Sequence, residues 1–354
     1  MEQPTEQVKK DIKSLKKKFR PSDFFAEYII KTIAFSSFAI IALIFVFVFR
    51  ETLPIFTHEE KDYNVEDFMQ SESYGNEDLY DESGKSIAAE KYGSLTDVEE
   101  DRASFKNLLG TEWQPISGEP KYGLIPLFIG SLKVTLIAIL FGAPIAIFAA
   151  IYSALFAHRR LREIIKPTIE LLASFPSVVI GFFALTTIAT LFQEIFGWSY
   201  RLNAFVGGIA MALAVIPIVY TVAEDSLTAI PKFMTEASFA LGANKWQTAF
   251  FIILPAATPG VFAAVLLGFG RAFGETMIVL MATGNAPLST FSFFDPVRTM
   301  SATIGAEMAE VVFGDTHYTV LFLIGSLLFI ITFITNAIAE FYVRAKLMKR
   351  FRGE

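Results

Sequence analysis

Long apolar segments separated by charged ones dominate this chain, and six of them are long enough to cross a membrane. A stretch of about 18 or more apolar residues with few charges is typical of a transmembrane helix. The sequence therefore predicts an all-α membrane protein with six transmembrane helices, at about 30–49, 126–156, 166–192, 204–223, 259–282 and 318–342. The second segment exceeds the roughly 20 residues that a bilayer requires, so we expect it to tilt or to extend beyond the membrane.

Charge is distributed unevenly and indicates an orientation. Residues 51–125 carry 18 acidic and 6 basic residues, a net charge of −12, while the whole chain has −6, so the remainder carries +6. Basic residues gather at 9–20, 159–166 and 344–352. Because positive charge is retained on the cytoplasmic side, we expect both termini in the cytoplasm and a long external loop after the first helix. The segment 224–256 then also lies in the cytoplasm.

These boundaries divide the chain into five parts: a basic cytoplasmic tail at 1–28, a first transmembrane helix at 29–50, an acidic external loop at 51–125, a five-helix core at 126–345 and a second basic cytoplasmic tail at 346–354. Nothing in the tails indicates nucleic-acid binding, since retained positive charge that attracts anionic lipid explains them. The acidic loop is either flexible or a small folded cap that docks an external binding protein. Its residues 81–86 imitate part of a phosphate-binding loop, but Leu79 occupies the position of the required first glycine.

Composition excludes several kinds of chemistry. The chain has no cysteine, which rules out disulfides, thiolate metal sites and cysteine catalysis. His58, His158 and His317 are scattered and have no metal-ligand spacing. We therefore expect no metal, no cofactor and no enzymatic activity in this chain. Arg50 and Glu51 follow the first apolar segment where a cleavable signal would have small residues, so that segment is expected to remain as a span.

Prolines interrupt several of the predicted spans. Pro144, Pro176 and Pro217 fall in their interiors, and membrane helices tolerate proline where neighbouring groups satisfy the freed backbone. Either these helices are simply kinked, or bent helices line a pathway and move against one another. Ser174 and Ser177 place hydroxyls on both sides of Pro176, so this segment is our candidate pathway element.

Two charged residues fall near the middle of the fifth predicted span. A charge at the bilayer centre costs about 2.5–3.5 kcal/mol and usually faces the bundle interior or an aqueous cavity. The spacing of Arg271 and Glu275 predicts that they share one helix face. They form either a structural ion pair or a substrate site, in which the guanidinium binds an oxyanion and the carboxylate accepts a proton from a species such as hydrogen phosphate. Lys133, near the outer end of the second span, is expected to extend to the membrane surface.

The polar segment between the fourth and fifth spans carries its own helix signals. Pro231 suits a first helical turn and Gly242 the left-handed position after a helix, which predicts a short helix at about 231–241. Asn244 and Gln247 have capping-box spacing and start a second short helix. Small residues and one aromatic lie on one face of the first helix, and this face either packs on its own bundle or docks on a partner: Phe233, Ala237, Ala240 and Leu241.

This segment resembles the cytoplasmic coupling loop of bacterial ABC-importer permeases. The family pattern has Glu-Ala-Ala, three residues, Gly, nine residues and Ile-x-Leu-Pro. The third position departs from it, since Ser238 and Phe239 precede Ala240. The resemblance implies a type I ABC-importer permease fold and a separate cytoplasmic ABC ATPase dimer, and it assigns the coupling role to Glu236, Ala237, Ala240, Gly242, Ile252, Leu254 and Pro255.

A second resemblance concerns substrate. Residues 270–285 (GRAFGETMIVLMATGN) are similar to the hallmark of the C-type permease subunit of the bacterial phosphate importer, and 174–185 and 300–310 resemble its third span and last external loop. The resemblance covers about 126–345. It implies a permease that moves phosphate across the inner membrane by alternating access, together with a sister permease and an external phosphate-binding protein. The implied substrate pathway contains Arg271, Glu275, Thr276, Ser174 and Ser177.

Three alternatives stay open at this point. A permease of the same class for sulfate or molybdate would share the coupling loop, but a carboxylate beside the arginine favours a substrate that carries a proton. A membrane enzyme or sensor would need a catalytic or nucleotide motif, which the sequence does not contain. A transporter driven by ions would have no need of a coupling loop.

Overall fold

The computed structural model describes residues 21–57, 105–117 and 120–352, and side chains within 25–56, 107–117 and 120–341. Within these residues six helices are long and apolar enough to cross a membrane: Phe25–Phe56, Ile125–Phe156, Ser177–Phe196, Ala204–Thr228, Lys245–Phe273 and Thr316–Phe341. They confirm the predicted all-α membrane protein with six spans. Most of the acidic loop, including the imitation of a phosphate-binding loop at 81–86, lies outside the described residues.

The chain forms two compact units, residues 1–50 and 51–354. The described part of the first unit belongs to a single long helix, α2 (Pro21–Thr57), which continues through Pro54. Its exposed surface is rich in Phe, Ile and Leu side chains, which is the composition expected of a helix that contacts lipid.

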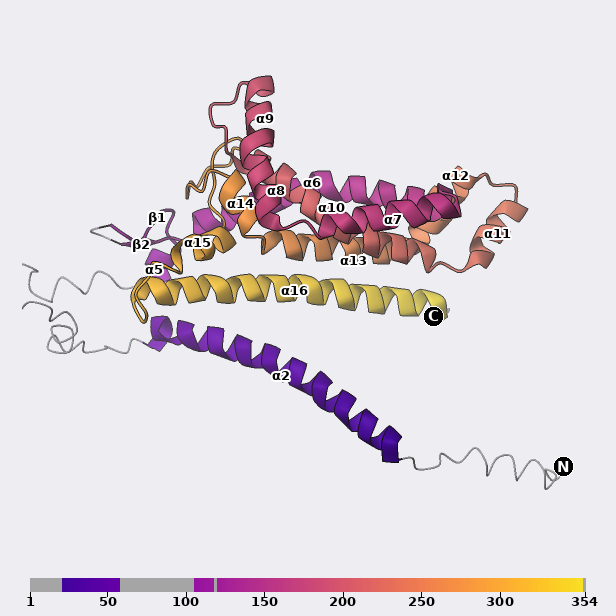
Figure 1. Cartoon of the computed structure of the whole chain (residues 1–354), viewed down its shortest axis with the longest axis horizontal. Coiled ribbons are helices and arrows are strands. Elements are labelled where there is room, and N and C mark those ends of the chain that lie inside the picture. Colours follow the sequence, from indigo (N-terminus) through magenta and orange to yellow (C-terminus); the bar gives the residue numbers. More distant parts are fainter. Residues whose placement is uncertain (1–20, 58–104, 118–119, 353–354) are drawn as a thin grey trace, which may run out of the picture. The chain divides into compact units, whose positions relative to one another are not determined.

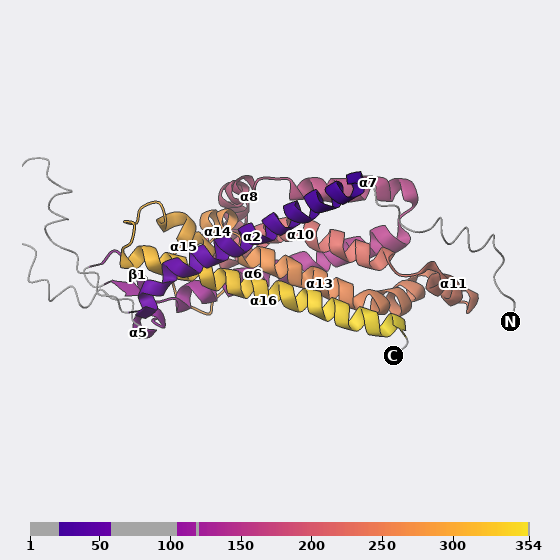
Figure 2. The same cartoon turned by 90° about the horizontal axis from the view of Figure 1, so that it is seen from below.

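The second unit is built around four long helices, shown in Figure 1 and from a second direction in Figure 2. Helix α10 packs along α6 and α13, and α13 packs along α16. Small residues allow the closest approach, as is common between membrane helices: a Cβ added at Gly208 of α10 would lie 2.5 Å from Cβ of Ile137 on α6. The four helices are α6 (Ile125–Ile151), α10 (Ala204–Thr228), α13 (Leu254–Phe273) and α16 (Thr316–Arg352).

The third predicted span is not one continuous helix, and the expected bounds of 166–192 are wrong. Helix α7 (Arg159–Ala173) ends before Pro176, whose ψ of 133° is extended, and α8 (Ser177–Phe183) begins after it. Proline lacks an N–H and clashes with a continuing helix, so Pro176 separates two helices rather than lying inside one. A π-helical segment, η3 (Ala184–Ile188), then leads into α9 (Ala189–Phe196).

The fifth predicted span of 259–282 is also broken. Helix α13 ends at Phe273, Gly274 follows as its C-cap, and α14 (Met277–Ala282) begins three residues after Gly274. In the other direction the apolar helix starts earlier than predicted, because the π-helical segment η4 (Thr248–Ile253) runs directly into α13. By contrast, Pro144 lies inside α6 and Pro217 inside α10, as the sequence predicts.

One end of the second unit carries the polar segment between α10 and α13, and the opposite end carries a short hairpin (Figures 1 and 2). At the first end lie α11 (Lys232–Ala240) and α12 (Lys245–Gln247), beside the π-helical end of α6, η2 (Tyr152–Phe156). At the second end, β1 pairs antiparallel with β2 so that Trp113 faces Tyr122. The elements at this end are α5 (Phe105–Leu108), β1 (Trp113–Gln114), β2 (Lys121–Tyr122) and α15 (Met300–Glu307).

Lys133 does not extend to the membrane surface, so that expectation is wrong. Its side chain is buried, and Nζ donates hydrogen bonds to the backbone carbonyls of Thr290, at 2.7 Å, and Ser292, at 2.8 Å. These carbonyls belong to the segment between α14 and α15. The lysine thus supplies donors to two backbone carbonyls that lie more than 150 positions away in the sequence, and no local pattern predicts such a contact.

A buried carboxylate ties the hairpin to the bundle. Glu307 is buried and pairs with Arg298, and it accepts hydrogen bonds from Trp113 Nε1 at 3.2 Å and lies 2.9 Å from His317 Nε2. Burial alone would raise the pKa of this carboxyl. The hydrogen bond with His317, the charge of Arg298 and the bond from Trp113 oppose that effect and together hold its pKa below the usual value.

Because the pKa of Glu307 is lower in the folded chain than in the unfolded one, its contribution to stability is complete above about pH 4.3 and is lost as pH falls through the folded-state value. We predict that Glu307→Gln lowers the thermal denaturation midpoint of the purified chain at pH 7, since hydrogen bonds to a charged group contribute about 1.5–3 kcal/mol. The gap between variant and wild type should narrow below about pH 4.3. Glu112→Gln is the matched control, since the Glu112–Lys121 pair of the hairpin is exposed. An equal loss in both variants would contradict this role of Glu307.

Candidate substrate cavity and coupling surface

The two helix breaks lie next to each other. Helix α8, which follows the first break, packs against α14, which follows the second. Gly181 permits this contact, because an added Cβ there would lie 3.1 Å from the carbonyl oxygen of Met277 and 3.0 Å from Sδ of Met281. The contact brings the two breaks next to each other, while Ser174, Pro176 and Gly274 remain exposed in the single chain.

A cavity of about 290 Å³ lies at these breaks, and α7, α8, α10 and α13 contribute to its wall. Its size is at the lower end of the roughly 300–1,000 Å³ that is usual for small-molecule sites. Most of its lining is apolar, and three polar side chains reach it. The lining residues are Leu172, Ala173, Phe175, Ser177, Ile180, Ala214, Ile218, Arg271 and Glu275.

Arg271 and Glu275 both line the cavity, but they do not share one helix face as their spacing predicts. Arg271 lies in the last turn of α13, whereas Glu275 lies beyond the helix end, in the break before α14. The prediction of a shared helix face near the middle of a span is therefore wrong, because the helix stops at Phe273. Among the hydrogen bonds and ion pairs of the described residues, none involves either side chain. The structural ion pair considered for them is thus not formed in this conformation.

The other predicted pathway residues divide between the cavity and its surroundings. Ser177 lines the cavity. The hydroxyl of Ser174 donates to the carbonyl of Leu171 in its own helix, at 2.6 Å, and Ser174 does not contribute to the lining. Thr276 faces α15 instead, since a Cβ added at Gly305 would lie 2.7 Å from its Cγ2.

The polar end of the unit agrees closely with its sequence signals. Pro231 is the N-cap of α11, and Gly242 has a φ of +83°, the left-handed conformation expected after the helix. Asn244 and Gln247 form the predicted capping box, with side chain to backbone distances of 2.8 and 2.9 Å. The short helix and its stop are therefore confirmed, because each depends only on local backbone chemistry.

The predicted face of α11 is exposed rather than packed on its own bundle. Leu241 is 89% exposed and Phe233 67% exposed, and Glu236, Ala237 and Ala240 are exposed beside them. Large apolar side chains gathered in the open are typical of a protein–protein contact. Ser238 points the other way, is buried, and its hydroxyl lies 2.9 Å from that of Thr248.

The remaining motif positions lie where η4 passes into α13. Ile252 belongs to η4, and Leu254 and Pro255 are the first residues of α13. Pro255 therefore occupies the first turn of a helix, where its missing N–H costs nothing. Through this continuous helix the exposed loop joins directly to Arg271 at the far end of α13.

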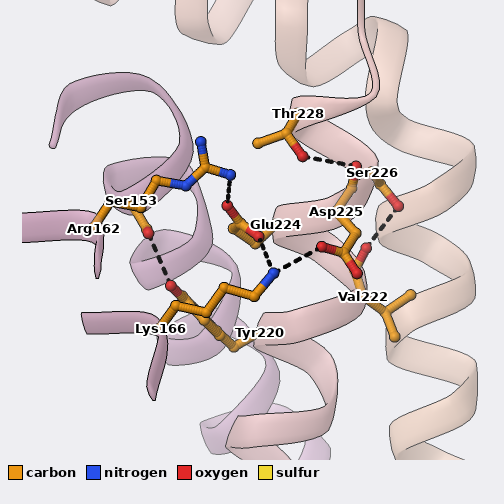
Figure 3. Close-up of polar contacts among 9 residues, drawn as sticks. All are labelled: Ser153, Arg162, Lys166, Tyr220, Val222, Glu224, Asp225, Ser226 and Thr228. Atoms are coloured by element: carbon orange, nitrogen blue, oxygen red, sulfur yellow. Dashed lines mark hydrogen bonds and ion pairs between the residues drawn. The ribbon is translucent and has the colours of Figure 1, made fainter. Parts of the chain in front are cut away.

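Sequence reasoning missed a charged cluster at the end of α10. Glu224 is fully buried, pairs with Arg162, and its Oε2 accepts a hydrogen bond from Lys166 at 3.0 Å. Figure 3 shows Arg162 and Lys166 of α7 contacting this carboxylate, and Lys166 contacting Asp225 as well. The signal was present, since two cations four residues apart share a helix face and an acidic pair ends an apolar span, but nothing local shows that they meet.

The six apolar helices define a helical membrane protein, and the family match gives its class. Residues 142–347 match the family described as binding-protein-dependent transport system inner membrane component, and the chain belongs to this family. It is a permease subunit of the ABC-importer class and a multi-pass protein of the inner membrane.

Relatives of the chain are themselves named as transport permeases. It is 33% identical over 227 residues to the probable ABC transporter permease protein YqgH of Bacillus subtilis, covering 64% of this chain and 74% of that protein. It is 32% identical over 252 residues to the phosphate transport system permease protein PstC of Xylella fastidiosa, covering 65% and 76%. The methionine transporter MetNI has a similar fold, at 19% identity and a TM-score of 0.47, over 61% of this chain and 92% of that chain. The resemblance to phosphate permeases of the C type is thus confirmed.

The orientation of α11 gives a prediction that needs no partner. Because the chain has no cysteine, single cysteines can report exposure directly. In the purified chain Leu241→Cys should react with a maleimide at least tenfold faster than Ser238→Cys, which is buried against Thr248. The rates are measured by mass spectrometry, with the unfolded chain as the reference for intrinsic reactivity. Equal rates in the folded chain would show that this face of α11 is covered by the bundle.

Proposed function

We propose that this chain is the permease subunit that carries inorganic phosphate inward across the membrane by alternating access. Its substrate would pass the cavity at the two helix breaks, and ATP-driven movement of a partner against α11 would open the cavity alternately to the two sides. Both termini and α11 would lie in the cytoplasm, where three basic clusters of the sequence are retained.

The observation that carries this proposal is the pair of unpartnered charges at one small cavity. A guanidinium without a counter-ion presents a planar set of donors that suits an oxyanion. Hydrogen phosphate also carries a hydroxyl that can donate a hydrogen bond to the Glu275 carboxylate, whereas sulfate has no such donor and would be repelled by it. Discrimination of this kind is strong, because a site built to hydrogen-bond one group leaves its polar atoms unpaired with an analogue that lacks it.

The proposed partners follow from the family and from the exposed loop. The family description names a binding protein, and several relatives are named as permeases of phosphate transport systems. We assign to this chain an external phosphate-binding protein, a sister permease and a cytoplasmic ABC ATPase dimer that docks on α11. Arg271 is exposed in the single chain, and a sister permease would enclose the pathway beside it.

A second candidate function is transport of another oxyanion, such as sulfate or molybdate. It stays open because the Bacillus subtilis relative is named only as a probable ABC transporter permease. The first experiment is therefore uptake of labelled phosphate in cells depleted of this chain and then complemented with it, with excess sulfate or molybdate as competitor. Uptake that depends on the chain and resists both competitors supports phosphate. Unchanged phosphate uptake on depletion would contradict the assignment.

The same assay tests the two charges. We predict that Arg271→Gln lowers phosphate uptake at least a hundredfold at unchanged abundance in the membrane, because it removes the charge that attracts the anion. Glu275→Gln should instead allow sulfate to compete with phosphate, since the repulsion is gone. Immunoblots of membranes supply the abundance, and Ser174→Ala is the control, because its hydroxyl bonds to its own helix. Loss of Arg271→Gln from the membrane would point to a structural role.

A further inference from the structure

The cluster around Glu224 joins three elements at the polar end of the unit. Its carboxylate holds Arg162 and Lys166 of α7, and Lys166 also donates to Asp225 of α10 at 3.0 Å. One helical turn before Glu224, the hydroxyl of Tyr220 donates to Ser153 Oγ of η2 at 2.8 Å. Figure 3 shows both sets of contacts side by side. The end of α10 is thus attached to α7 and to the end of α6.

Helix α7 depends on this attachment more than its neighbours do. None of its residues is buried, and only Ile165 and Ile169 pack as partly buried side chains against the main core. Its apolar anchoring is therefore shallow. The two cations on Glu224 fix both its distance from α10 and its rotation, since a buried carboxylate is strongly disfavoured unless both oxygens stay paired.

The position of the cluster connects the two sites described above. Helix α10 ends at Thr228 and α11 begins at Lys232, so a short connection of residues 229–231 joins α11 to the last turn of α10, while α11 also packs on η4. Helix α7 ends at the cavity, which Leu172 and Ala173 line. From Lys166 to Ala173 the helix spans roughly 10 Å at 1.5 Å per residue. Helix α7 continues through Pro167 from Lys166 to Ala173, so a displacement of its end at Glu224 is carried along the helix to its cavity end.

We propose that Glu224 is a positioning residue, which links movement of α11 to movement of the cavity end of α7. This inference rests on the proposed function, because it assumes that a partner displaces α11. It assigns no contact with substrate to Glu224. Arg162 and Lys166 act with it as the two points by which α7 is held.

The test uses the complete transporter, purified with its ATPase and sister permease and reconstituted in lipid. A single cysteine at Ala173, in a chain that otherwise has none, reports the cavity end of α7 by its rate of maleimide labelling with and without ATP. We expect ATP to change this rate at least fivefold in the Ala173→Cys parent and less than 1.5-fold when Glu224→Gln is added. ATP hydrolysis should stay within twofold, because α11 itself is unchanged.

Glu163→Gln is the matched control, since Glu163 lies on α7 in an exposed pair with Arg159; its labelling response should equal the parent's. Lys166→Gln is the second variant, because it keeps the Arg162–Glu224 pair and should assemble even if Glu224→Gln does not. We expect it to reduce the ATP response at least twofold. The inference is overturned if either assembled variant shows the same ATP-dependent change in labelling rate as the parent, or if the parent itself shows no change. It is also overturned if ATP hydrolysis falls in proportion to the labelling response, which would indicate a purely structural role.

These readouts separate this inference from the substrate assignment. Labelling and hydrolysis do not depend on which oxyanion is carried. Phosphate uptake by vesicles that contain the unsubstituted transporter therefore tests the proposed function alone, while the labelling response of the Ala173→Cys parent tests Glu224. An unsubstituted transporter that takes up no phosphate, beside a parent that responds to ATP, would overturn the assignment of phosphate and leave the role of Glu224 supported.

Discussion

The rule that backbone polar groups must be satisfied inside a membrane shapes this protein more than any other constraint. Helices meet that rule on their own, and a break in a helix meets it only where other parts of the protein cover it. The breaks at 174–176 and 274–276 are brought together by the contact of α8 with α14, and the cavity forms beside them. The site thus lies where two interruptions of helical structure meet, next to the ends of the candidate spans that start at Ser177 and end at Phe273.

Three glutamates show how the protein assigns charge within an apolar fold. Glu224 and Glu307 are buried, the first held by two cations and the second by Arg298, His317 and Trp113, so they fix elements in place at opposite ends of the unit. Glu275 and the nearby Arg271 have no such partners among the described residues. Buried charge is costly unless it is paired, and charge left unpaired at a cavity is available to a ligand. Pairing therefore separates the structural charges from those we propose to act on substrate.

Local signals were read correctly where one short segment contains all the chemistry. The helix stop at Gly242, the capping box at Asn244 and the number of spans depend on nothing distant. The predicted helix bounds are wrong where a single break in the backbone interrupts a continuous apolar segment. Pro176 and Gly274 each interrupt a segment that hydropathy alone predicts to be one continuous helix. Hydropathy does not detect such a break, because the side chains on both sides of it are apolar. The expected shared face of Arg271 and Glu275 failed for this reason.

The sequence by itself determined that this is a membrane permease with six spans and an exposed loop, since hydropathy, charge and family motifs are properties of contiguous segments. It also supplied the residues of the candidate site. Only the tertiary structure decided which of them meet: Ser177 lines the cavity and Ser174 does not, Lys133 holds a loop, and Glu224 binds two cations from α7. Contacts between segments far apart in sequence depend on how helices pack, and packing is set by many small steric fits that no single segment records.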